Sequence, residues 1–228
     1  MESKEIIQNI NKIYSRFKIS PNLRKHQKSV ASVGAIICDN WKHNLHDYGI
    51  IRDDIIAFLL VHDIGNIIKF KFDPQSLKML GDEKMNSEYW KQVREEIILK
   101  YGNKVKDATK KMLMELNPSK GITHLIEEMA FSKTDIIAKG NDWPLKISAY
   151  SDLRVGPFGV MTLKERIKDW RKRYGGKTRR FDSDGDYLTE AQVNFFYECA
   201  YQIESQIMEN LNISKEDINN DSIKVYFG

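Results

Sequence analysis

The run of residues from Ile51 to Phe70 constrains the fold of this chain more than any other feature. Its apolar residues cover most of the circumference of the helix that it predicts, and a helix of that kind is buried by its neighbours. The run nevertheless contains His62 and Asp63 side by side. Burial of two such groups is costly unless they are paired or bind a metal. We therefore expect a central helix inside a bundle whose other members supply the partners of His62 and Asp63.

Helical periodicity continues through most of the remaining chain. Apolar residues recur at steps of three and four from Ile6 to Phe17, from Val30 to Trp41 and from Val193 to Ile207. Strand-like alternation is weak and confined to the final segment SIKVYF, residues 222–227. The chain has no internal repeat and no linker rich in Pro or Gly. These patterns predict an all-α fold, a single domain of roughly nine or ten helices.

Composition agrees with one globular domain. The 228 residues suffice for one sizeable core, and 41% apolar with 30% charged residues is an ordinary balance for such a domain. No apolar run reaches the roughly 20 residues that cross a bilayer, and the N-terminus lacks the pattern of a secretory signal. Cys38 and Cys199 lie among apolar residues, as reduced core thiols do. We expect a cytoplasmic protein with no membrane partner.

Positive charge is concentrated in the segment LKERIKDWRKRYGGKTRR, residues 163–180. It contains nine Lys or Arg residues against Glu165 and Asp169, a net charge of +7 in a chain of net charge +4. Leu163 and Ile167 belong to an apolar stripe that we expect to pack inward, with the cations outside. A local cationic surface suits a phosphate-bearing partner, such as a nucleotide or a nucleic acid, or it is a solvated helix face.

Four ionisable residues fall on the apolar side of expected helices. His26 continues one apolar stripe and Asp152 another, while His62 and Asp63 lie about 100° apart around the axis of the central helix. Two imidazoles and two carboxylates directed into one bundle form a mixed nitrogen and oxygen donor set. Such a set suits Mn, Fe, Co, Ni, Zn or Mg, and helical bundles build metal sites from facing helices in this way. The sequence therefore predicts one divalent metal ion as a cofactor.

The order His26, then His62-Asp63, then Asp152 resembles the H…HD…D signature of the HD superfamily of metal-dependent phosphohydrolases. The flanking segments agree: LRKHQKSVASVG is similar to the family's first-histidine helix, LLVHDIGN to its HD helix, and AYSDLRVGP to its final-aspartate segment. The similarity covers about residues 22–160. It leaves a C-terminal helical extension, about residues 161–228, that includes the basic segment.

The resemblance implies that four residues ligate the ion: His26, His62, Asp63 and Asp152. Two further coordination positions would remain for a water molecule and a phosphoryl oxygen. A metal lowers the pKa of its water toward neutrality and polarises a phosphoryl group. The implied activity is hydrolysis of a phosphoric ester by metal-activated water, in a nucleotide or a related phosphorylated small molecule, with Asp63 acting in catalysis as well as in ligation.

Neighbouring residues extend the predicted site. Asn66 and Lys69 follow His62 by four and seven residues, on the same face of the expected helix. We expect Asn66 to orient the attacking water and Lys69 to neutralise a phosphate, unless Lys69 is a helix-end charge that reaches solvent. Several HD enzymes carry Glu, Lys or His at the position of Asn66, and this chain departs from that pattern. Arg24 and Arg154, close in sequence to two of the ligands, are further phosphate-binding candidates.

Two alternatives to hydrolysis remain open on the sequence. Because Asn66 replaces a proton-transferring side chain, the chain is alternatively a non-catalytic HD module that binds nucleic acid or a nucleotide through the basic segment. Some HD proteins instead hold two irons and oxygenate carbon substrates, but that chemistry needs more ligands than the four above. His124 is the one histidine in its part of the chain that a second metal can recruit, and its place off the neighbouring apolar stripe favours the surface.

Overall fold

The structure, a computed structural model, describes residues 1–157, 159–174, 180–181 and 187–227. Its secondary structure is almost entirely helical, which confirms the all-α prediction. The described residues hold more helical segments than expected, because several helices are only one or two turns long. The α-helices are α1 Ser3–Gln8, α2 Ile10–Arg16, α3 Pro21–Asp39, α4 Arg52–Val61, α5 Pro74–Leu77, α6 Ser87–Tyr101, α7 Val105–Met114, α8 Lys120–Glu128, α9 Thr134–Lys139, α10 Trp143–Leu153, α11 Leu163–Tyr174, α12 Glu190–Glu209 and α13 Lys224–Phe227.

Short 3-10 helices and two small hairpins complete the secondary structure of the described residues. The 3-10 helices are η1 Leu45–Tyr48, η2 Asn66–Lys69, η3 Lys78–Asn86, η4 Phe131–Lys133 and η5 Lys215–Asp217. The strands pair antiparallel, β1 Val155–Gly156 with β2 Gly159–Val160 and β3 Arg180–Phe181 with β4 Tyr187–Leu188. The final segment, which has weak strand alternation in sequence, forms helix α13.

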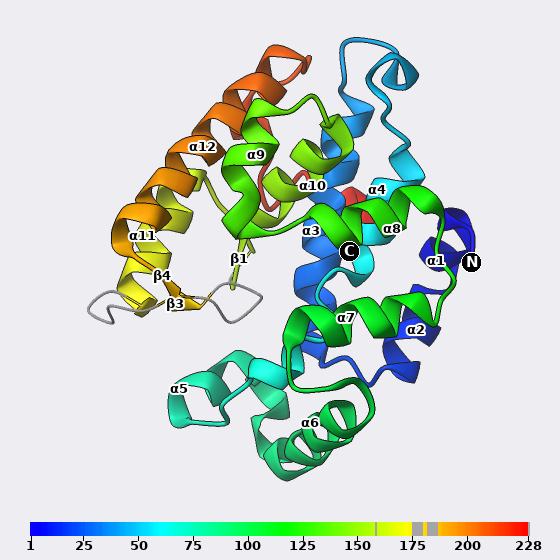
Figure 1. Ribbon diagram of the computed structural model, residues 1–228, viewed down its shortest axis with the longest axis vertical. Helices are drawn as coiled ribbons and strands as arrows, with labels where there is room; N and C mark the ends of the chain where they lie inside the picture. Colours follow the sequence, from blue (N-terminus) through cyan, green and yellow to red (C-terminus); the bar gives the residue numbers. More distant parts are fainter. Residues whose placement is uncertain (158, 175–179, 182–186, 228) are drawn as a thin grey trace.

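Helices α3, α4 and α10 pack together in the middle of the molecule (Figure 1). Gly34 of α3 allows this approach, because a Cβ atom there would lie only 2.6 Å from Leu59 Cδ1 of α4. The same atom would lie 3.4 Å from Ser151 Oγ of α10. The three helices that bring the predicted ligands are therefore in direct contact at one glycine.

The central helix is shorter than the apolar run in the sequence. Helix α4 ends at Val61, and residues 62–65 form turns before η2 begins. The prediction of one continuous helix from Ile51 to Phe70 is therefore wrong. The backbone at Gly65 packs so closely against α7 that a Cβ atom would lie 2.4 Å from Thr109 Oγ1. The chain therefore turns at Gly65, in contact with α7, although the apolar residues of the sequence continue at helical spacing past this point.

The C-terminal extension shares its core with the rest of the chain. One cluster of buried apolar residues extends from Ile6 to Ile218. A backbone hydrogen bond from Lys42 N to Asn210 O, 2.8 Å long, joins the end of α12 to the segment after α3. A second, smaller cluster joins α11 to α12 and consists of Ile167, Leu188, Val193, Phe196 and Tyr197. The extension is therefore packed on the helices that carry the predicted ligands.

The described helices include none that is long and apolar enough to pass through a lipid bilayer. Cys38 and Cys199 are buried and form no disulfide. Burial raises the pKa of the Cys38 thiol to about 12. Both cysteines therefore lie in the interior, as the sequence predicts.

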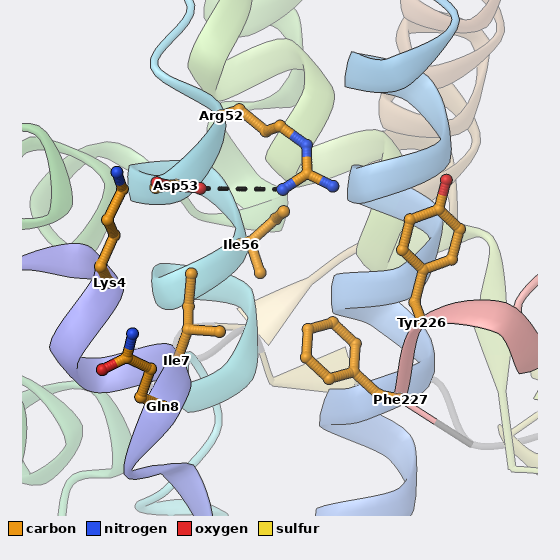
Figure 2. Close-up of a pocket in the computed structure, with 8 residues that line it drawn as sticks. All are labelled: Lys4, Ile7, Gln8, Arg52, Asp53, Ile56, Tyr226 and Phe227. Carbon is orange, nitrogen blue, oxygen red and sulfur yellow. Dashed lines mark ion pairs between the residues drawn. The ribbon is translucent and has the colours of Figure 1, made fainter.

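A cavity of about 270 Å³ lies between α1, α4 and the C-terminal residues (Figure 2). Arg52 and Tyr226 line it, and both side chains already have a partner in Asp39: Arg52 Nε donates to Oδ1 at 2.5 Å, and Tyr226 Oη donates to Oδ2 at 2.9 Å. The cavity adjoins the N-terminal end of α4, whereas His62 follows the C-terminal end. It is therefore separate from the predicted site.

Candidate metal centre

The four predicted ligands converge from three parts of the fold. His26 lies in α3, His62 caps the C-terminus of α4, Asp63 lies in the following turn, and Asp152 lies near the C-terminus of α10. Polar residues on separate apolar stripes thus meet in space, as the sequence patterns predict. Their binding of a metal stays a prediction.

The distances within this cluster suit ligands of one cation. Asp152 Oδ1 lies 3.4 Å from His26 Nε2 and 3.4 Å from His62 Nε2. Asp63 Oδ2 lies slightly farther from the same two nitrogens, at 3.9 Å and 3.8 Å. Donor atoms that share an ion at about 2.0–2.2 Å are themselves about 3–4 Å apart. His26, His62 and Asp152 offer ligand atoms that all lie within 4.8 Å of one another, so these three already have the spacing of a shared ion, whereas Asp63 would have to move closer.

His62 anchors one ring nitrogen and turns the other toward the carboxylates. Its Nδ1 lies 2.7 Å from Leu59 O, so we assign the N–H to Nδ1. Its Nε2 is buried and has no hydrogen-bond partner among the described residues. Histidines that bind metals commonly donate their second nitrogen to a backbone carbonyl in this way. A cation between His62 and the carboxylates would supply the partner that a buried polar atom normally has.

The electrostatics of the metal-free cluster favour a positive charge at its centre. Burial alone would lower the pKa of His62, but Asp63 and Asp152 outweigh it and raise that pKa to about 9. Burial would likewise raise the pKa of Asp152, yet His26 and His62 hold it well below its ordinary value. A metal must therefore displace a proton from His62, and the carboxylates that now stabilise the proton would then stabilise the metal.

The end of α4 changes the positions of Asn66 and Lys69. Asn66 is the half-buried first residue of η2, and Lys69 is its exposed last residue. The two residues therefore do not extend an α-helical face from His62, and the prediction of a shared helical face is wrong. Their roles in orienting water and binding phosphate stay predictions.

Arg24 lies on α3, two residues before His26. Its Nε donates to Ile19 O at 2.6 Å, and its guanidinium carbon lies 5.8 Å from the centre of the Tyr14 ring. One of its donors is therefore already used by the backbone, and its role in phosphate binding stays a prediction.

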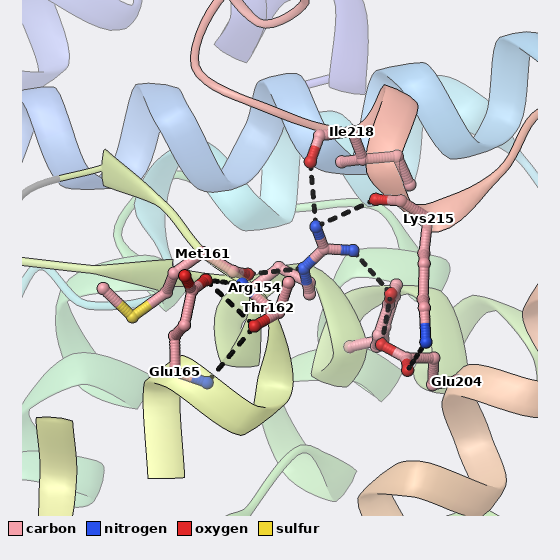
Figure 3. A network of polar contacts seen from close by, with 8 residues as sticks. Arg154, Met161, Thr162, Glu165, Glu204, Lys215 and Ile218 are labelled. Carbon is pink, nitrogen blue, oxygen red and sulfur yellow. Dashed lines mark hydrogen bonds and ion pairs between the residues drawn. The ribbon is translucent and has the colours of Figure 1, made fainter. Parts of the chain in front are cut away.

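Arg154 has a structural role, which corrects the phosphate site predicted there. The residue is only 2% exposed. Its Nε donates to Met161 O at 2.6 Å and its Nη2 donates to Ile218 O at 2.8 Å (Figure 3). Its Nη1 donates to Tyr150 Oη at 2.6 Å, and that hydroxyl donates to Glu204 Oε2 at 2.8 Å. All three nitrogens are used inside the protein, so Arg154 is not available to a phosphate.

Gln27 and Gly65 also shape the cluster, although neither is among the site residues predicted from the sequence. Gly65 permits the contact with α7 described above. Gln27 is fully buried next to His26, and it lies four residues before the buried Ala31 on α3. A polar residue on an apolar stripe is the signal that identifies His26, so the same signal is able to identify Gln27.

The remaining sequence candidates lie away from the cluster. The His124 side chain is 50% exposed, which confirms its surface position, and its Nε2 lies 2.5 Å from Asp142 Oδ2. Among the described residues, no second group of three His, Cys, Asp or Glu side chains has metal-binding spacing. Helix α11 forms the first part of the basic segment, with Leu163 and Ile167 buried as expected. Residues 175–179 of that segment lie outside the described residues.

No protein-family model, curated protein or solved structure matches this chain.

Proposed function

We propose that this protein is a metal-dependent phosphohydrolase that cleaves a phosphoric ester of a nucleotide or a related phosphorylated molecule. One observation carries the proposal: two imidazoles and the Asp152 carboxylate meet at one point beside Asp63, and His62 Nε2 is buried there without a well-aligned hydrogen bond. The order of the same four residues in the sequence, which resembles the HD superfamily signature, supports it.

The residues of the cluster would divide the work between them. His26 and His62 offer nitrogen donors, while Asp63 and Asp152 offer oxygen donors and negative charge. A divalent cation held by these groups supplies Lewis-acid activation of water and of a phosphoryl oxygen. The side chains of Asp63 and Asp152 are 28% and 33% exposed, against 5% for His62, so substrate and water would approach from the carboxylate side.

Metal analysis followed by a phosphatase screen tests this proposal. We expect about one equivalent of Mn²⁺, Co²⁺ or Zn²⁺ per chain, and phosphate release from at least one of a panel of nucleoside mono-, di- and triphosphates and cyclic nucleotides. His62→Ala and Asp63→Ala should abolish hydrolysis. His124→Ala is the matched control, since this histidine also pairs with an aspartate but lies outside the cluster, and it should leave hydrolysis unchanged. Hydrolysis that survives both cluster substitutions would rule the site out.

A second candidate function is nucleic-acid binding through α11. Lys164, Lys168 and Lys172 are exposed and recur every four residues, so about 6 Å separates successive lysines along one face of the helix. The acids of this helix, Glu165 and Asp169, are engaged with the helix N-cap and with a neighbouring arginine. Among the described residues, no ion pair is recorded for the three lysines. Their charge is therefore available to a row of phosphates.

Salt-dependent binding of a fluorescent single-stranded oligonucleotide tests the second candidate. Replacing Lys164, Lys168 and Lys172 by Ala should weaken binding and reduce the slope of log K against log salt by about 2, because each phosphate contact to a single strand contributes about 0.7. A matched triple substitution of lysines that are ion-paired elsewhere, at Lys110, Lys133 and Lys224, should change the slope less. Equal effects of the two triple variants would show that α11 is an ordinary solvated face.

A further inference from the structure

Gln27 of α3 is fully buried and hydrogen-bonds to the turn that follows α4. We assign the amide orientation from its neighbours: the nitrogen then donates to Leu60 O at 2.9 Å, and the oxygen accepts from Ile64 N at 3.2 Å and from Asp63 N at 3.3 Å. This orientation of the amide satisfies all three backbone groups. One side chain thus holds the turn from which two of the four converging donors come.

These hydrogen bonds satisfy groups that the end of α4 leaves without helical partners. Carbonyl groups in the last turn of a helix lack partners within it, and buried backbone groups need partners elsewhere. Leu60 O also accepts from Tyr14 Oη at 2.8 Å, so it has two donors. For Asp63 N, Gln27 is the acceptor recorded among the described residues. Loss of Gln27 would therefore affect Asp63 more than Leu60.

Helix α7 fixes the other side of the same turn. A Cβ atom on Gly65 would lie 3.0 Å from Thr109 N and 3.1 Å from Val105 O, so the backbones are in close contact. The turn is therefore held between α7 and the buried amide of Gln27. Neither side leaves it room to shift without the loss of a contact or a hydrogen bond.

We propose that Gln27 is a positioning residue of the metal centre, which holds the backbone of His62 and Asp63 in register with His26. His26 and Gln27 are consecutive on α3, so one turn of helix both supplies a donor and fixes the segment that supplies two more. The inference rests on the proposed function, because it takes the four converging side chains as ligands. It adds a residue that touches neither metal nor substrate and acts through the backbone.

Gln27→Met is the direct test, because methionine has a similar length and no amide. The substitution leaves Asp63 N without its acceptor. The Kd for Co²⁺, measured by titration of the full-length protein, should rise about 10- to 100-fold, the usual effect of losing a partner that orients metal ligands. The visible absorption of bound Co²⁺ should also change in intensity, because it reports on the coordination geometry.

Gln206→Met is the matched control. Gln206 also links separate helices, since it donates to Ala138 O at 3.1 Å and accepts from Lys146 Nζ at 2.6 Å. Both variants should lose thermal stability, but Gln206→Met should keep the wild-type Kd and Co²⁺ spectrum. An equal loss of Co²⁺ affinity in the two variants would make Gln27 an ordinary structural residue and overturn the proposal.

Hydrogen exchange of the metal-free wild type tests the inference without any substitution. The amide of Asp63 should exchange slowly, as hydrogen-bonded amides do, whereas Ile64 N also donates to Val61 O at 3.3 Å and does not report on Gln27 alone. Exchange as fast as that of an open turn overturns the role of Gln27, and so does a Gln27→Met Kd within about twofold of wild type. If the wild type binds neither Co²⁺ nor Zn²⁺, the proposed function fails and the positioning role fails with it. Tight wild-type binding with an unaffected variant overturns the role of Gln27 alone.

Discussion

The candidate metal centre and the Arg154 network are neighbouring polar clusters that satisfy their polar groups in opposite ways. Asp152 and Arg154 are only two residues apart. Asp152 faces His62 Nε2, a buried nitrogen that makes no well-aligned hydrogen bond. Arg154 is buried, and each of its three guanidinium nitrogens donates to a protein oxygen. The Asp152 side chain is one-third exposed, whereas Arg154 is almost completely enclosed.

On the proposed function, this difference separates a binding site from a structural link. His62 Nε2 lacks a well-aligned hydrogen bond, and the carboxylates 3.4 Å and 3.8 Å away would stabilise either a proton or a cation there. A complete set of hydrogen bonds leaves nothing for a ligand to satisfy. Polar residues near a site are therefore better assigned by their remaining hydrogen-bonding capacity than by their distance along the sequence.

Arg154→Met should produce the largest change in the free energy of unfolding, and it tests whether the Arg154 network is a structural link. The substitution removes the donors of Tyr150 Oη, Met161 O and Ile218 O. We expect the free energy of unfolding to fall by about 3–5 kcal/mol, the usual cost of removing one member of a buried charged network. Urea unfolding measures it. A loss below about 1 kcal/mol would mean that water replaces the guanidinium and that the network is not a rigid link.

His62→Leu should show the reverse pattern at the metal centre. Leucine fills a similar space, so above the His62 pKa of about 9, where the wild-type imidazole is neutral, the metal-free free energy of unfolding should stay within about 1 kcal/mol of wild type. The Kd for Co²⁺ should rise more than about 100-fold, beyond the effect of losing an orienting partner. Unfolding and Co²⁺ titrations of the same preparation give both values. A destabilisation as large as that of Arg154→Met would remove the distinction between the two clusters.

A change of pH should affect stability and metal affinity in opposite directions, because His62 of the metal-free protein titrates at an accessible pH. Its pKa is raised from 6.5 to about 9, so the stability gained from its protonation is fully present below pH 6.5 and is lost as the pH rises through about 9. Affinity for Co²⁺ should instead increase over this interval, by up to about tenfold per pH unit, as the competing proton leaves. Metal titrations across this range measure the slope. An affinity independent of pH would contradict ligation by His62.

Tyr150→Phe should have the smallest effect. It removes one hydroxyl that accepts from Arg154 and donates to Glu204, while the other bonds of Arg154 remain. We expect a loss of about 1–1.5 kcal/mol in the free energy of unfolding and an unchanged Kd for Co²⁺. Thermal unfolding and Co²⁺ titration provide the check. A marked loss of Co²⁺ affinity would show that the network also shapes the metal centre.

The convergence of the cluster is predictable from sequence, whereas its local geometry is not. His26 and Asp152 interrupt apolar stripes, and a polar residue in such a position must find a partner inside the fold. The end of α4 leaves no comparable trace, because apolar residues continue beyond Val61 at helical spacing. It coincides with contacts to Gln27 on α3 and Thr109 on α7, which only the folded chain brings together.

The role of Arg154 is also unpredictable from the local sequence, because it depends on contacts with residues far along the chain. Its position two residues after Asp152 favours a phosphate-binding role, and nothing in the neighbouring sequence argues against it. Its acceptor Ile218 O lies 64 residues farther along the chain. Long-range contacts of this kind decide whether a cationic side chain is available to a ligand or is hydrogen-bonded within the protein. Local sequence patterns do not reveal such contacts.

The bond between Arg154 and Ile218 also has a consequence for biosynthesis. A ribosome makes the chain from its N-terminus, so His26, His62 and Asp63 emerge long before Ile218 does. Until that late segment appears, the guanidinium beside Asp152 lacks one of its native acceptors. We therefore expect α10 to settle only after Ile218 has emerged from the ribosome, and, on the proposed function, metal binding to follow that step rather than the emergence of Asp152.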